Sequence, residues 1–179
     1  MKGWLDGLER WFERRYDIRP IGDGGYMLRL GLIRYRGPDL AFADGRVVRP
    51  GALAGELHID NRLAAALHAE GRGGLRYRRE VFRALTALAR DLETRPEYRA
   101  IQMIGGPSLF WQEATAAGFE HRRLPALTRW WLVRWERFLL ARYHPAGRRR
   151  LAEGRRTEIR QVWMTRRTLL ERYGKDRSR

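Results

Sequence analysis

The apolar positions of this chain change period several times, from helical spacing to strand alternation and back. Apolar residues recur at three- and four-residue spacing from Trp4 to Tyr16, with charged residues between them, which predicts an amphipathic helix. A break rich in glycine leads to residues 26–35, which predict a strand, and residues 36–38 predict the turn that ends it. The chain therefore opens as helix, loop and strand.

Two short β segments follow. Residues 40–48 predict a hairpin, because Asp44-Gly45 supplies the positive backbone torsions of a tight turn. Residues 55–60 alternate polar and apolar side chains in the manner of a strand. Asp60 or Asn61 is then placed to cap a helix that runs through residues 63–67.

The cleanest apolar stripe lies between residues 78 and 92 and predicts a core helix. Residues 101–104 predict a short buried strand, and the Gly-Gly-Pro-Ser sequence at 105–108 predicts a turn into a helix that ends at Gly118. Ser108 is the expected cap of that helix; phosphate binding by backbone amides at its glycine-rich start is the alternative. Residues 119–122 then predict another extended segment.

Two helical patterns complete the chain, at residues 127–143 and 155–173, separated by a Pro-Ala-Gly break. Strands mixed with helices predict an α/β or α+β fold, in which a small mixed sheet packs against helices. The expected organisation is an α/β body at 1–125 that includes the N-terminal helix, a basic Trp-rich helical hairpin at 126–173 packed on the body, and a disordered tail at 174–179.

Charge is distributed unevenly along the chain. The 179 residues carry a formal net charge of +16. Residues 121–179 hold 18 Lys/Arg against 5 Asp/Glu, a net of +13, together with four of the seven tryptophans. The first 120 residues hold 19 against 16, a net of +3. This asymmetry predicts a negatively charged surface as partner.

The helix at 127–143 has the composition of a helix that lies in a membrane interface, since Trp and Tyr suit the headgroup boundary and arginines reach lipid phosphates. Packing of the same face on the body and on the following helix is the alternative. The residues expected to contact an anionic membrane are Arg129, Trp130, Trp131, Arg134, Trp135, Arg137, Arg148, Arg149, Arg150, Arg155 and Arg156.

Nucleic acid is the competing anionic partner, because a pI near 11.3 and an arginine-rich helix suit phosphate-backbone binding. The chain has no zinc-finger spacing, no RNA-binding aromatic signature and no helix-turn-helix pattern. A helix as bulky as Trp130 to Trp135 also fits a groove poorly. Nucleic-acid binding therefore stands as the alternative to membrane docking.

The residues best suited to chemistry are Glu56, His58 and Asp60, which share one face of the predicted strand. Two carboxylates and an imidazole can bind a metal or move a proton; a polar strand face with Asp60 as helix cap is the alternative. The other histidines, at 68, 121 and 144, show no metal-ligand spacing, and the chain has no cysteine. The sequence identifies no catalytic constellation and predicts neither a cofactor nor a metal.

Most of the chain resembles the YkoP-like family, through residues 26–38, the Asp44-Gly45 hairpin, residues 55–61 with the helix after them, and the Gly118-Phe119 helix end. These are small bacterial proteins, and the same domain occurs attached to polysaccharide deacetylases. The resemblance implies a link with cell-envelope polysaccharide metabolism and its enzymes as partners. It does not extend to the deacetylase domain.

A weaker similarity connects the chain to acetyltransferases of the GNAT superfamily. Residues 108–120 are similar to the late helix of that family, which ends in Gly-Phe, and Arg-x-x-Gly-x-Gly at 19–24 is similar to its pyrophosphate loop. In that family the loop joins a central strand to a helix, whereas here it precedes a strand. Ala114 stands where the family often has an acid tyrosine. A transferase with GNAT-like topology is the second functional alternative.

The expected location is the cytoplasm, with peripheral association at the inner face of the membrane. The amino terminus lacks the apolar run of a secretory signal, and no stretch reaches the ~18 uninterrupted apolar residues that a spanning helix needs. The leading functional prediction is a peripheral, non-catalytic protein of the bacterial envelope that docks on an anionic membrane.

Overall fold

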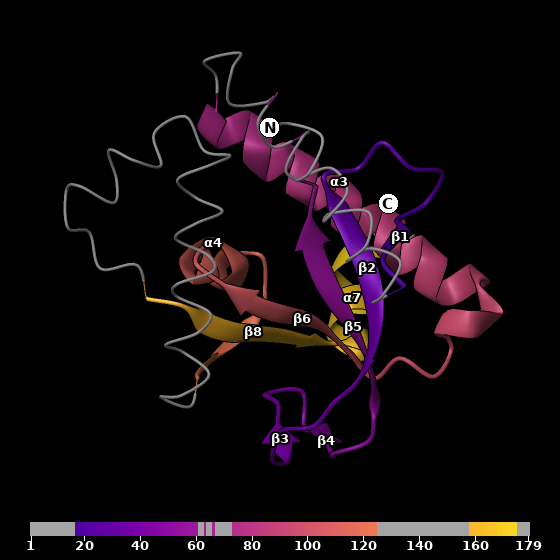
Figure 1. Ribbon diagram of the computed structural model, residues 1–179, viewed down its shortest axis with the longest axis vertical. Helices are drawn as coiled ribbons and strands as arrows, with labels where there is room; N and C mark the ends of the chain where they lie inside the picture. Colours follow the sequence, from indigo (N-terminus) through magenta and orange to yellow (C-terminus); the bar gives the residue numbers. More distant parts are fainter. Residues whose placement is uncertain (1–16, 61–62, 64–65, 67–72, 125–157, 175–179) are drawn as a thin grey trace, which may run out of the picture.

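A computed structural model describes residues 17–60, 63, 66, 73–124 and 158–174 of the chain (Figure 1). Within these residues a six-stranded sheet lies beside a two-stranded hairpin. The strands of the large sheet are β1 (Arg19–Pro20), β2 (Leu28–Arg34), β5 (Leu53–Ile59), β6 (Met103–Ser108), β7 (Glu120–Arg123) and β8 (Arg160–Thr165). The hairpin consists of β3 (Leu40–Ala41) and β4 (Val47–Val48). The helices are α3 (Gly73–Thr94), α4 (Trp111–Ala116) and α7 (Arg166–Tyr173), with a 3-10 turn η1 (Pro96–Tyr98).

The predicted mixed α/β class is confirmed. The strand expected at 26–35, the hairpin around Asp44-Gly45, the strand at 55–60, the core helix at 78–92 and the extended segment at 119–122 all form, with shifted ends. The helices predicted at 4–16 and 127–143 lie outside the described residues.

The strand order of the large sheet is β1-β2-β5-β6-β8-β7. Neighbouring strands are antiparallel except β5 and β6, which run parallel and are joined by the long helix α3. A parallel pair needs such a crossover, because its second strand must start at the same end of the sheet as the first. β8 lies between β6 and β7, so the last of the described strands enters the sheet between two earlier ones.

The position of β8 corrects the prediction of a helix at 155–173. Residues 160–165 form a strand, and only Arg166–Tyr173 are helical. Val162 and Met164 are buried on the side of α3, whereas Trp163 is buried on the opposite side. A strand buried on both faces presents a continuous apolar run, which periodicity cannot distinguish from a buried helix. This part of the expected basic hairpin therefore belongs to the central sheet.

The Gly-Gly-Pro-Ser sequence at 105–108 is a second correction, because it forms the end of β6 rather than a turn. Gly105 has a φ of 151°, and a Cβ built there would lie 1.9 Å from the backbone oxygen of Val162. Glycine is required at this point because β8 approaches too closely to leave room for any side chain. The prediction that Ser108 caps the following helix is also wrong, because Phe110 precedes the first residue of α4 and no side chain caps it. Ser108 instead accepts a hydrogen bond from the Phe110 N–H at 3.0 Å, ahead of the helix.

The main core lies between one face of the sheet and the helices α3, α4 and α7, which cover it in Figure 1. Leu85, Leu88 and Leu92 of α3 are fully buried against Leu30 and Ile104 of the sheet. Each such side chain contributes about 1.5–3 kcal/mol when fully buried. The apolar stripe recognised in the sequence is therefore the face of α3 that holds the sheet.

Arg166 fixes the end of α3 to the start of α7. Its guanidinium donates to the backbone oxygens of Leu92 at 2.6 Å, Tyr98 at 2.8 Å and Arg99 at 3.3 Å. These carbonyls lie where α3 ends and η1 follows, where a helix leaves acceptors without intrahelical partners. This arginine is therefore a structural residue and does not contribute to a free basic surface.

The β3–β4 hairpin packs on the opposite face of the sheet and forms a second apolar cluster. Phe42 and Val48 are buried there against Met103 and Trp163. The Trp163 ring meets the ring of Tyr35 edge to face, with 6.1 Å between centroids. The hairpin thus covers one end of this face.

Asp44, at the hairpin turn, ties the hairpin to the start of α7. It accepts hydrogen bonds from the Thr165 hydroxyl, from the Arg46 N–H at 3.0 Å and from the Thr168 hydroxyl at 3.3 Å. Burial, the largest single influence, would raise the pKa of Asp44. The three hydrogen bonds and the charge of Arg167 outweigh burial and hold the pKa of Asp44 below its ordinary value.

We expect Asp44→Asn to lower the free energy of unfolding by about 1–2 kcal/mol at neutral pH, because charge-assisted hydrogen bonds are lost. A depressed native pKa gives stability that is fully present above the unfolded pKa of about 3.9 and is lost as the pH falls through the native pKa. The gap between wild type and variant should therefore close below about pH 4. Urea unfolding at several pH values measures this difference in the free energy of unfolding, and Asp23→Asn, at an exposed position, is the control. A difference that does not change with pH would contradict the role of Asp44.

Candidate functional site

The structure brings two of the three predicted polar residues of β5 together. Glu56 and His58 share the face opposite the main core, while Leu57 and Ile59 pack toward the core. His58 Nε2 lies 3.4 Å from Glu56 Oε2, and about a quarter of each side chain is exposed. Gly31 of β2 pairs with Glu56, and a Cβ at Gly31 would lie 3.3 Å from His58 Nε2. The glycine therefore leaves room for the imidazole.

His58 Nε2 is buried and has no hydrogen-bond partner within the described residues. Its contact with Glu56 is at ion-pair distance but does not have hydrogen-bond geometry. A carboxylate beside an imidazole can orient the ring and support proton transfer. The pair therefore supplies one acid–base unit.

Asp60 has structural partners instead. Its Oδ2 accepts from Arg29, with Nη2 at 2.9 Å and Nε at 3.1 Å. Its Oδ1 accepts from the backbone N–H of Leu63 at 3.1 Å, which is the capping geometry expected from the sequence. Its carboxylate is therefore used to join β2, the end of β5 and the residues after it.

The polar pair lies beside the place where β5 and β6 diverge. The two strands pair only from Ala54 to Glu56 and from Met103 to Gly105, although β5 continues to Ile59 and β6 to Ser108. A Cβ at Gly106 would lie 3.4 Å from Glu56 Cγ, so this carboxylate reaches the diverging strand. Ligands of open α/β sheets bind where neighbouring strands separate at their carboxyl ends.

A metal site finds no support in these residues. The described part of the chain contains no group of three or more His, Cys, Asp or Glu side chains that could hold an ion. His121 lies on β7, with Nδ1 3.2 Å from the Thr115 hydroxyl and its ring 4.9 Å from that of Trp111. The histidines at 68 and 144 lie outside the described residues.

The loop at residues 19–24 is already occupied by internal partners. The Gly22 N–H donates to Asp91 Oδ2 at 2.7 Å, and the Gly22 carbonyl accepts from Arg95 at 2.6 Å. Arg19 is paired with Asp17. A carboxylate thus takes the amide that a phosphate would need, so this loop holds the start of the sheet to α3.

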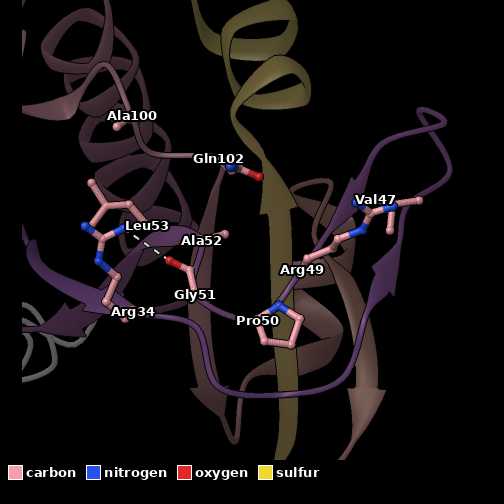
Figure 2. Close-up of a pocket in the computed structure, with 9 residues that line it drawn as sticks. All are labelled: Arg34, Val47, Arg49, Pro50, Gly51, Ala52, Leu53, Ala100 and Gln102. Carbon is pink, nitrogen blue, oxygen red and sulfur yellow. Dashed lines mark hydrogen bonds between the residues drawn. The ribbon is translucent and has the colours of Figure 1, made fainter.

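An open groove lies at the other end of the sheet, where β2 ends and β5 begins (Figure 2). Its volume is about 650 Å³. It is lined by Arg34, Val47, Arg49, Pro50, Gly51, Ala52, Leu53, Ala100 and Gln102. No sequence pattern indicated this groove, because its residues come from separate segments that only the fold brings together.

The residues predicted to contact a membrane, from Arg129 to Arg156, lie outside the described residues, so their prediction stands as it was made. Within the part of the chain that is described, no helix is long and apolar enough to cross a membrane.

Comparison with known families decides the relationship of the chain. The model of the YkoP domain matches residues 2–173, which is nearly the whole sequence. The chain belongs to the YkoP family. No curated protein and no solved structure matches it. The described residues of this YkoP protein contain two candidate sites, the pair Glu56–His58 and the groove at Arg34.

We expect Asp60→Ala to lower the free energy of unfolding by about 1–3 kcal/mol, because it removes a helix cap and leaves Arg29 without its carboxylate. Asp60→Asn should cost less, since its amide oxygen can still accept from Leu63. Urea denaturation measures both. The control is Asp17→Ala, which breaks an exposed ion pair and should change stability by less than about 1 kcal/mol. Equal effects of Asp60→Ala and Asp17→Ala would contradict the structural role of Asp60.

Proposed function

We propose that this YkoP protein is a peripheral, non-catalytic protein linked to bacterial cell-envelope polysaccharide metabolism, which docks on the anionic inner face of the cell membrane. The observation that carries the proposal is the composition of residues 125–157, where nine arginines stand against two acidic residues and three tryptophans accompany them. The link with the envelope and its enzymes rests on what the family resemblance implies.

Three other C-terminal arginines make contacts within the fold and therefore do not carry this proposal. Arg160 pairs with Glu158 at 3.1 Å and stacks on Trp111, with its guanidinium 3.9 Å from the ring centroid. Arg167 pairs with Glu171 at 2.7 Å, and Arg166 binds backbone carbonyls. None of these contacts involves an arginine of residues 125–157, so the composition of that segment continues to carry the proposal.

The tryptophans divide in the same way. Trp163 is 2 % exposed and belongs to the second apolar cluster, so it does not serve an external surface. Trp130, Trp131 and Trp135 remain as interfacial anchors. Each arginine near an anionic leaflet contributes ~1 kcal/mol, so several of them together suffice for peripheral binding without a lipid anchor.

Vesicle sedimentation at low salt tests the docking. Wild type should pellet with phosphatidylserine-containing vesicles and not with neutral phosphatidylcholine vesicles. Replacing three arginines of the segment with Gln should weaken binding about 100-fold, at ~1 kcal/mol for each charge. This first variant is Arg148→Gln, Arg149→Gln and Arg150→Gln. The second variant, Trp130→Ala, Trp131→Ala and Trp135→Ala, should also weaken binding.

The matched control removes three exposed arginines from α3 and leaves residues 125–157 intact. It is Arg78→Gln, Arg79→Gln and Arg90→Gln. This control should bind nearly as wild type does. An equal loss in the control would show a general charge effect and would contradict the assignment to residues 125–157. Absence of vesicle binding, combined with a salt-dependent gel shift of duplex DNA or RNA, would favour nucleic acid instead.

The second candidate function is a transferase of GNAT-like topology. Two observations favour it: β5 and β6 diverge after three paired positions, and Glu56 and His58 lie beside the opening. The occupied amide of Gly22 speaks against the loop at 19–24 as its phosphate site.

If this second function is correct, acyl-coenzyme A or a nucleotide-sugar should raise the melting temperature in a saturable manner, because a ligand that binds only the native state stabilises it. Glu56→Gln should reduce any resulting transfer activity without abolishing ligand binding. Divalent metals serve as a third set of probes. An unchanged melting temperature with every ligand would remove the transferase alternative.

A further inference from the structure

The outward face of α3 carries a line of arginines. Arg79, Arg83 and Arg90 are all exposed, and Thr86 lies between the last two. Successive members of this line are four, three and four residues apart, which places them on one side of the helix. At about 1.5 Å per residue, the line is about 16 Å long. We call these four residues the α3 ridge, and they lie opposite the apolar stripe that packs on the sheet (Figure 1).

The fold leaves most of the charge of the ridge without a counterion. Arg79 and Arg90 have neither an ion pair nor a hydrogen bond among the described residues. Glu93, three residues after Arg90, is directed towards the end of α7, because its Oε1 lies 3.5 Å from a Cβ built at the glycine after that helix. Arg83 pairs with Glu80 at 2.9 Å, but 59 % of the arginine side chain stays exposed. The ridge therefore offers guanidiniums to an external anion.

Aromatic rings border the ridge. On one side, the guanidinium of Arg83 lies over the ring of Tyr26, 5.8 Å from its centroid. On the other side, Phe82 lies three residues after Arg79 and is 40 % exposed, which is unusual for a large apolar side chain in the described part of the chain. The rings of Phe82 and Tyr173 contact each other, with 5.6 Å between centroids. One exposed ring is thus held beside the line of guanidiniums.

This arrangement suits a single strand of nucleic acid better than a duplex or a lipid leaflet. Single-strand sites combine a positive track for the phosphates with aromatic rings on which bases stack. A helix that reads a duplex enters the major groove. The middle of α3 is flanked instead, because a Cβ built at Gly22 would lie 3.7 Å from the Cβ of Ala87. A leaflet needs a broad apolar face that inserts, whereas the ridge has one exposed ring.

We propose that the α3 ridge binds single-stranded nucleic acid, with Arg79, Arg83 and Arg90 donating to phosphate oxygens and Phe82 stacking on a base. Guanidiniums bind phosphate by two parallel hydrogen bonds, and stacking tolerates any base, so the binding does not depend on sequence. The proposal is independent of membrane docking, because none of these residues belongs to the segment 125–157.

Fluorescence anisotropy of a labelled oligouridylate, titrated with the full chain, tests the proposal. An oligonucleotide of about 12 nucleotides falls within the span of single-strand sites. Binding should saturate and should weaken as the salt concentration rises. An abasic oligonucleotide of the same length carries the same phosphates without bases, and it should bind about tenfold more weakly because stacking is lost. Equal affinity for the two oligonucleotides, or no binding of oligouridylate, would overturn the proposal.

Two variants separate the phosphate contacts from the stacking contact. Arg79→Gln combined with Arg90→Gln should weaken oligouridylate binding about 100-fold, tenfold for each charge-assisted hydrogen bond. It should also make the slope of log affinity against log salt shallower by about 1.4, at about 0.7 for each phosphate contact. Phe82→Ala should weaken oligouridylate binding about tenfold and leave the abasic oligonucleotide unaffected. Phe82→Tyr should restore the stacking.

The matched control removes two exposed arginines that lie off the ridge, by Arg46→Gln combined with Arg78→Gln. Arg78 belongs to the same helix but points about 100° away from Arg79. This control should bind oligouridylate nearly as wild type does, and melting temperatures show that each variant is folded. An equal loss in the control, or an unchanged salt slope in Arg79→Gln with Arg90→Gln, would overturn the assignment to the ridge.

Discussion

The close pairing of β8 with β6 is the constraint on which the described fold depends. β8 pairs with six residues of β6 on one side and with four residues of β7 on the other. At Gly105 the two backbones approach so closely that no side chain fits. The chain then enters α7, where Arg166 binds the carbonyls at the end of α3. Residues near the C-terminus thereby close both the sheet and the helical layer.

This closure also gives the two faces of the sheet different roles. The face under α3, α4 and α7 is apolar, and its side chains form the main core. The opposite face is apolar only where the β3–β4 hairpin covers it, and it carries Glu56 and His58 along β5. Alternation along β5 places its apolar and polar residues on opposite faces, which explains why the polar pair lies on this one. The pair lies beside the divergence because the pairing of β5 with β6 ends at Glu56.

The sequence was most informative where an element has one buried face. The stripe at 78–92 and the alternation at 55–60 predicted α3 and β5, and Asp60 was correctly expected as a cap. It failed at β8, where burial on both faces removes the alternation, and at Gly105, where glycine serves close packing instead of a turn. The pair Glu56–His58 could be found because both residues lie on one strand. The groove at Arg34 could not, since its lining depends on contacts between distant segments.

The excess of arginine near the C-terminus consequently has more than one physical meaning. Arg166 replaces missing helix hydrogen bonds, and Arg160 covers the ring of Trp111. Neither use requires an external anion. A net charge counted from composition overstates the charge offered to a partner wherever guanidiniums bind carbonyls, carboxylates or aromatic rings within the fold. Among the described residues, the arginines that suit an external anion are therefore those outside such contacts.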